Sequence, residues 1–152
     1  MTLKFPGGHK RVLIDTSVWI YHFEQHAEFA APAGRVIENL EAGKFRGIAS
    51  ELTLLELTVR PLQLGRQDVA DDYEILLSYF PHLELVSITR EILIEAAGLR
   101  ARYKLRTPDA IQVATGLRMG ATLAVTNDEG WRKVPLIETL VLSDLTTGPD
   151  QH

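Results

Sequence analysis

Short apolar runs that alternate with longer helical patterns constrain the fold of this chain more than any other feature of its sequence. The runs are four to six residues long and rich in β-forming side chains, and several are bounded by Gly or a polar turn. They predict strands at residues 11–15, 45–49, 83–88, 121–126 and 139–142. The segments between them predict helices at residues 16–23, 33–42, 51–59, 69–80, 91–104 and 108–119.

This order of elements predicts a three-layer α/β/α fold, with a mostly parallel central sheet of about five strands and helices on both faces. In such sheets, ligands bind outside the carboxyl ends of the strands. The last helix has the clearest boundaries: we expect Thr107 to cap its N-terminus, Pro108 to take its first position and Gly120 to end it.

The 152 residues match the usual size of one domain. We expect a single domain over residues 1–152, with its core at about 11–142 and a polar tail at 143–152. The composition is 45% hydrophobic and 24% charged, which excludes a largely disordered chain. We see neither a membrane-spanning apolar run nor a secretory signal, so we expect a cytoplasmic protein. The absence of cysteine excludes disulfides, thiolate nucleophiles and zinc ribbons.

Four carboxylates lie where a ligand of such a sheet is expected. Asp15 ends the first strand, and Asp128 follows the fourth. Glu56 lies in the helix after the second strand, and Asp109 lies in the first turn of the helix before the fourth. If the sheet is parallel, all four can converge at one edge, where their mutual repulsion requires cations.

Each acid also has an ordinary structural explanation. Asp15 can cap the following helix, and Glu56 can pair with Arg60 one turn later. Asp109 suits the positive end of a helix dipole, and Asp128 suits a turn. The four together favour Mg²⁺ or Mn²⁺, which prefer oxygen ligands, and metal-assisted phosphoryl hydrolysis.

Four segments together resemble the motifs of PIN-domain ribonucleases, in particular the VapC toxins of toxin–antitoxin pairs. They are IDTSVWI, the pattern S-x-x-T-x-x-E-x-x-x-x-P that begins at Ser50, RYKLRTPDAIQVATGL and TNDEGW, in family order over residues 12–131. The resemblance implies a PIN-like fold and an endoribonuclease that uses Mg²⁺ or Mn²⁺. It also implies an RNA substrate, a homodimer and a small VapB-like antitoxin partner.

The resemblance also implies roles for individual residues. Asp15 and Asp109 match the principal metal ligands of the family, and Glu56 and Asp128 match acids that bind metal directly or through water. Whether Asn127 or Asp128 faces the metal stays open. Two polar residues match positions that support the site, Ser17 and Thr126.

A cluster of basic residues immediately precedes Asp109 in the sequence. Its members are Arg100, Arg102, Lys104 and Arg106. They can grip RNA phosphates beside the site, or they can be cations favoured at a helix C-terminus. His22 and His26 have a spacing that can bind metal, but no third ligand is evident.

Two other functions fit the pattern less well. A non-catalytic PIN-like module that binds RNA or protein would be expected to lose some of the four acids. A phosphatase or phosphotransfer domain with a nucleophilic aspartate normally needs a second acid two residues later, or a Lys after a late strand. Asp15-Thr16-Ser17 lacks the second acid.

Overall fold

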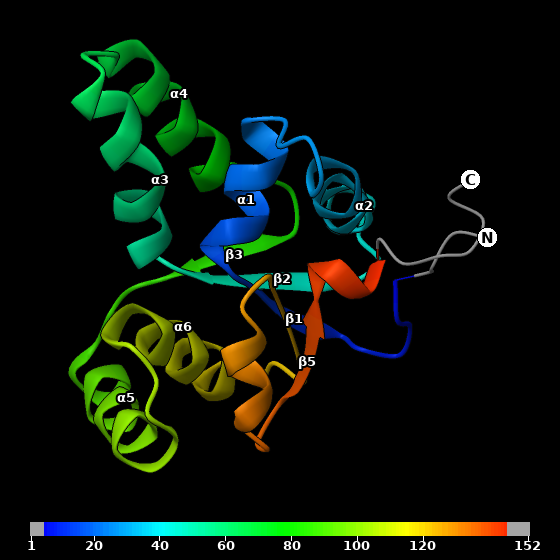
Figure 1. Cartoon of the computed structure of the whole chain (residues 1–152), viewed down its shortest axis with the longest axis vertical. Coiled ribbons are helices and arrows are strands. Elements are labelled where there is room, and N and C mark those ends of the chain that lie inside the picture. The colour runs from blue at the N-terminus through cyan, green and yellow to red at the C-terminus, as the bar shows by residue number, and fades with distance from the viewer. Residues whose placement is uncertain (1–4, 146–152) are drawn as a thin grey trace.

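A computed structural model describes residues 5–145 and shows a parallel sheet between two layers of helices (Figure 1). The strand order is β3-β2-β1-β4-β5, and each neighbouring pair is parallel. The expected α/β/α fold is therefore confirmed. The strands are β1 (Arg11–Ile14), β2 (Arg46–Ser50), β3 (Leu83–Val86), β4 (Leu123–Thr126) and β5 (Glu138–Val141).

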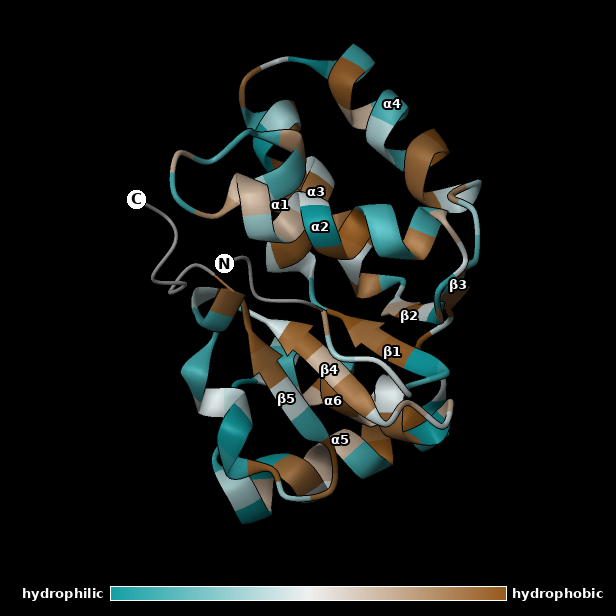
Figure 2. Ribbon diagram, turned by 90° about the vertical axis from the view of Figure 1, so that its right-hand side faces the viewer, coloured by the Kyte–Doolittle hydropathy of each residue, from teal (hydrophilic) through white to brown (hydrophobic). Residues whose placement is uncertain are grey.

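Helices of both layers pack on the sheet through alternating strand residues. Val12 and Ile14 of β1 face α1–α4, whereas Leu13 between them faces α5 and α6, as the two-residue period of a strand requires. Figure 2 shows the apolar strands between the two layers. The helices are α1 (Thr16–Phe23), α2 (Ala30–Glu41), α3 (Leu52–Gln63), α4 (Gln67–Ser78), α5 (Arg90–Tyr103), α6 (Thr107–Arg118), and the short 3-10 helices η1 (Glu129–Lys133) and η2 (Leu142–Leu145).

All eleven expected strands and helices are present, and most boundaries differ from the prediction by one or two residues. The predicted cap of α6 is wrong. Arg106 is the N-cap, because its backbone is extended and its carbonyl accepts the first helical hydrogen bond, from Ala110 at 2.9 Å. Thr107 is the first helical residue. α3 extends four residues beyond the expected end and includes Pro61.

Close packing of α6 on β1 depends on Gly116. A Cβ at this position would lie 2.8 Å from Cδ2 of Leu13 and 3.0 Å from its Cβ, closer than side chains normally approach. Glycine therefore lets the helix lie directly on the strand. This contact sets the position of the N-terminal turn of α6 relative to the carboxyl end of β1.

The packed chain extends to the last residue that the structure describes. Leu145 of η2 is buried in the core, three residues beyond the core boundary expected from the sequence. The rest of the expected polar tail, residues 146–152, lies outside the described residues. Over residues 5–145, no helix has the length and apolar character needed to cross a membrane.

Candidate active site

Asp15 lies at the carboxyl end of β1, and its side chain is held by three hydrogen bonds. Its Oδ1 accepts from the backbone N–H of Thr16 at 2.8 Å, which caps α1. Its Oδ2 accepts from the hydroxyls of Ser17 at 2.9 Å and Thr126 at 2.8 Å. Capping and a place in the candidate site are therefore compatible, and both residues expected to support the site contact this carboxylate.

The pKa of Asp15 depends on its burial and on the nearby acids. The pKa of Asp15 is raised from 3.8 to about 6, and burial of the carboxyl group is the largest cause. The hydrogen bonds from Thr126 and Ser17 oppose this rise, whereas the negative charges of Asp109 and Glu56 add to it. Three acids that are far apart in sequence therefore share one electrostatic field.

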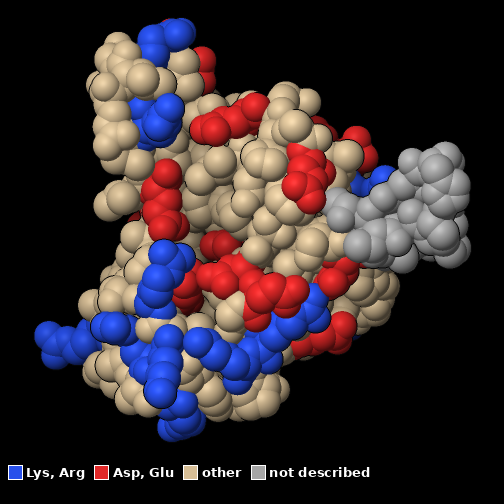
Figure 3. Space-filling model, viewed as in Figure 1, with Lys and Arg blue, Asp and Glu red and all other residues tan. Residues whose placement is uncertain are grey.

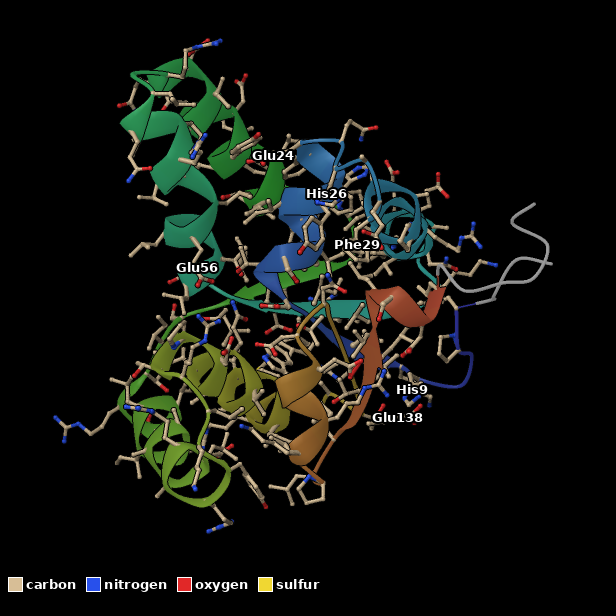
Figure 4. All side chains as sticks on the ribbon, in the orientation of Figure 1. His9, Glu24, His26, Phe29, Glu56 and Glu138 are labelled. Carbon is tan, nitrogen blue, oxygen red and sulfur yellow. The ribbon has the colours of Figure 1, made fainter. Side chains whose placement is uncertain are left out.

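Glu56 extends from α3 and is fixed by a hydroxyl of α1. Its Oε1 accepts from Oγ1 of Thr16 at 2.7 Å. Figure 4 labels Glu56 at the sheet end of α3, on the side facing α6. The alternative ion pair with Arg60 does not form in the part of the chain that the structure describes.

A buried polar network behind Glu56 was not assigned a role from the sequence. Nε2 of Gln112 donates to Oγ1 of Thr16 at 3.2 Å and to Oγ1 of Thr53 at 3.0 Å, and all three residues are buried. The Thr16 hydroxyl accepts from Gln112 and donates to Glu56, so the network presents Glu56 as an acceptor. The signal available in the sequence was Gln112, three residues after Asp109 on one helix.

Asp109 lies in the first turn of α6 and is 8% exposed. Its Oδ2 accepts from Nε of Arg106 at 3.0 Å, within the same turn. Both the helix dipole and the guanidinium therefore compensate its charge. Arg106 is largely exposed, so its charge is available at the surface of the site.

Asp128 is adjacent to the other acids but is engaged in a turn. Its Oδ1 accepts from the N–H of Gly130 at 2.8 Å, which caps η1, and its own N–H donates to Oγ1 of Thr126 at 3.1 Å. Thr126 therefore links Asp128 to Asp15. Asn127 instead donates from Nδ2 to the Tyr21 hydroxyl at 3.3 Å.

Three of the four acids line a groove of about 400 Å³, which we call the acidic groove. Figure 3 shows red acidic side chains gathered in a hollow of this face, with blue basic side chains beside them. Asp128 does not line the groove. The lining residues are Asp15, Thr16, Ser17, Ile20, Leu55, Glu56, Val59, Arg106 and Asp109.

The acidic groove does not form a closed metal cage. Among the described residues, no three His, Asp or Glu side chains are arranged to hold a metal ion. His22 and His26 therefore have no third ligand within this part of the chain. The donors around the groove are carboxylate and hydroxyl oxygens. This set fits an ion such as Mg²⁺, which retains several waters and takes only one or two carboxylates from the protein.

Of the four clustered bases, only Arg106 lines the acidic groove. Arg100 donates from Nε to the carbonyl of Leu105 at 2.9 Å, and the guanidinium of Arg102 lies 6.0 Å from the centre of the Tyr103 ring. Lys104 caps α5 in a left-handed conformation. The four basic residues therefore differ in their contacts, and Arg106 is the member of the cluster that lines the acidic groove.

The chain belongs to the PIN domain family, whose model matches residues 12–136. No curated protein matches the sequence closely enough to show a relationship.

Solved structures share the fold at low identity. A toxin–antitoxin complex from Klebsiella pneumoniae is 22% identical, with 88% of this chain and 98% of that chain covered and a TM-score of 0.66. VapBC2 from Rickettsia felis, bound to a promoter DNA fragment, is 16% identical over 86% and 98%, with a TM-score of 0.68. VapBC-1 from nontypeable Haemophilus influenzae is 15% identical over 88% and 98%, with a TM-score of 0.65.

Proposed function

We propose that this PIN-domain protein is a metal-dependent endoribonuclease that acts as the toxin of a toxin–antitoxin pair. The observation that carries the proposal is the convergence of Asp15, Glu56 and Asp109 on one groove beside Arg106. They come from three separate segments and repel one another. Such an arrangement is costly for folding alone, and it suits a site that binds a cation and a phosphate.

In this proposal, Asp15 and Asp109 hold Mg²⁺ or Mn²⁺, and Glu56 and Asp128 complete the site directly or through water. When bound, the ion would lower the pKa of an attacking water and neutralise charge on the scissile phosphate. Glu56, whose Oε1 accepts a hydrogen bond from Thr16, would take a proton from that water. The shared groove and its oxygen donors support the roles of Asp15, Glu56 and Asp109, whereas the role of Asp128, which lies outside the groove lining, rests on the family resemblance.

The remaining polar residues orient the Asp15 carboxylate or attract RNA. Ser17 and Thr126 hold Oδ2 of Asp15, which fixes the direction of the carboxylate. Arg106 presents a cation at the mouth of the acidic groove, where an RNA phosphate would enter. Arg100, Arg102 and Lys104 extend this positive region along α5 and favour the approach of RNA.

The toxin role and the partners are inferred from the neighbours and the surface. The similar solved structures are described as toxin–antitoxin or VapBC complexes. Two apolar side chains that line the acidic groove are exposed, Leu55 at 63% and Val59 at 44%. Such a patch suits a protein partner. We infer a homodimer and a small VapB-like antitoxin that covers the groove.

Cleavage of RNA with and without Mg²⁺ or Mn²⁺ tests the proposal. We expect endonucleolytic products that disappear with EDTA and with Asp15→Asn, while the variant still folds. Cleavage that persists unchanged in Asp15→Asn would remove the assigned mechanism. Tight RNA binding without turnover would instead support the non-catalytic binding module.

A further inference from the structure

A second cavity lies at the opposite end of the sheet, and we call it the basic pocket. Its volume is about 490 Å³, which is within the range of small-ligand sites. It is formed by residues that precede β1, β2 and β3 or begin them, far from the acidic groove. The lining residues are Gly8, His9, Lys10, Gly43, Lys44, Phe45, Arg46 and His82.

The parallel sheet brings these residues together. The N–H of Arg46 donates to the carbonyl of Lys10 at 2.8 Å, and the N–H of Gly47 donates to the carbonyl of His82 at 2.9 Å. Lys10, Arg46 and His82 therefore lie side by side at the amino ends of three neighbouring strands. Lys44 comes from the turn that enters β2.

The basic pocket carries excess positive charge in a chain whose net charge is −4. No Asp or Glu is among its lining residues, although Nε2 of the lining His9 lies 3.4 Å from Oε1 of Glu138. Glu84 lies 3.5 Å from Nε of Arg46 and also 3.9 Å from Arg11, so one carboxylate serves two guanidiniums. Within residues 5–145, neither Lys10 nor Lys44 forms an ion pair.

Two residues with positive φ angles, Gly43 and His82, form part of the wall of the basic pocket. Gly43 has φ +76°, and a Cβ there would lie 3.0 Å from the His82 ring, so only glycine fits. His82 has φ 65°, and its Nδ1 lies 3.2 Å from the carbonyl of Leu40. A non-glycine residue in this region is uncommon, and here it holds an imidazole against the turn.

We propose that the basic pocket binds a phosphate-bearing anion. Lysine ammonium and arginine guanidinium groups are the usual side-chain partners of phosphate, and two lysines, an arginine and two histidines surround a space of suitable size. The phosphate belongs either to a small free compound or to a nucleic-acid backbone. The proposal is independent of the nuclease assignment.

Calorimetric titration with pyrophosphate, without divalent metal and at physiological salt, tests the first source. We expect the double substitution Lys10→Gln and Lys44→Gln to weaken binding by about tenfold or more, as loss of charge-assisted contacts predicts. The matched control is Arg60→Gln with Arg90→Gln, which removes the same charge from exposed positions elsewhere. His82→Asn removes the imidazole but keeps a residue that tolerates positive φ.

A second titration with a single-stranded oligonucleotide, in an Asp15→Asn background, tests the backbone source. Weaker binding of either anion in the Lys10/Lys44 variant alone supports the proposal and identifies the source. Equal losses in the pocket and control variants would show non-specific attraction and overturn it. Unchanged binding of both anions would also overturn it. Thermal unfolding shows whether each variant retains the fold.

Discussion

The two edges of the same sheet collect opposite charges. The residue after β1 and the nearby helices α3 and α6 supply Asp15, Glu56 and Asp109. The residues before β1 and β2 supply Lys10 and Lys44. Both convergences have one cause, because neighbouring parallel strands align all their starts at one edge and all their ends at the other. A parallel sheet can therefore hold two chemically distinct sites that share no residues.

The edges differ in how firmly their charges are held. At the acidic groove, Asp15 accepts three hydrogen bonds, and a buried amide–hydroxyl network supports Glu56. At the basic pocket, Lys10 and Lys44 are exposed and form no ion pair within residues 5–145. The contacts there belong to the other basic groups: His82 to a backbone carbonyl, His9 to Thr122 and Arg46 to Glu84. The hydrogen-bonded carboxylates of the acidic groove have the pre-organisation that the proposed catalysis would need, and the exposed lysines of the basic pocket suit the proposed binding of an anion.

The largest expected effect is a loss of RNA cleavage when the acidic groove is changed but not when the basic pocket is changed. Asp15→Asn should lower RNA cleavage by about a thousandfold, because it removes charge at the centre of the acidic groove. Lys44→Gln should leave kcat within about twofold, because the basic pocket and the acidic groove share no lining residue in the described part of the chain. Single-turnover cleavage assays measure both, and a comparable loss in the two variants would contradict the separation.

A steric change should disturb the acidic edge selectively. Gly116→Ala places a Cβ against Leu13 and should cost about 1–3 kcal/mol in the free energy of unfolding. It should also weaken RNA cleavage, because α6 positions Asp109. The matched control is Gly98→Ala in α5, which meets no atom within 4 Å and should stabilise the fold by about 0.5–1 kcal/mol. Denaturant unfolding measures both changes.

The pH dependence of stability should report the repulsion at the acidic edge. Without metal, the pKa of Asp15 is about 6 in the folded protein, above its value of 3.8 in the unfolded chain. The folded state therefore binds the proton more tightly, and its stabilisation is complete below pH 4 and lost as the pH rises through 6. This pH-dependent loss should amount to about 3 kcal/mol in the wild-type protein, and it should be absent in Asp15→Asn. Parallel curves for the two proteins would disprove the raised pKa.

The smallest effect should come from the supporting network. Gln112→Leu removes two hydrogen bonds to threonine hydroxyls and should cost about 1–2 kcal/mol in stability. If the network also positions Glu56, kcat should fall about tenfold while KM stays constant. The same stability loss with unchanged kcat would show that Gln112 has a purely structural role.

Much of the fold and of the candidate site could be predicted from the sequence. The alternation of strand and helix patterns was sufficient for the α/β/α architecture, because each element is short and uniformly patterned. The cap of α6 was misassigned because Thr107 is a better capping residue than Arg106, and local propensity does not include the Arg106–Asp109 ion pair. Asp15, Glu56 and Asp109 were placed correctly at one edge by strand direction alone.

What only the tertiary structure decided is how those groups face one another. Asp128 does not line the groove, and its carboxylate accepts from the Gly130 amide. The sequence offered this turn role and a role in the site as alternatives, without showing which way the carboxylate is oriented. The buried network of Thr16, Thr53 and Gln112 joins three distant segments, and the basic pocket joins the starts of three strands. Sequence determines the elements and their polarity because these are local. Contacts between side chains depend on packing across the whole sheet, and they exist only once the chain has folded.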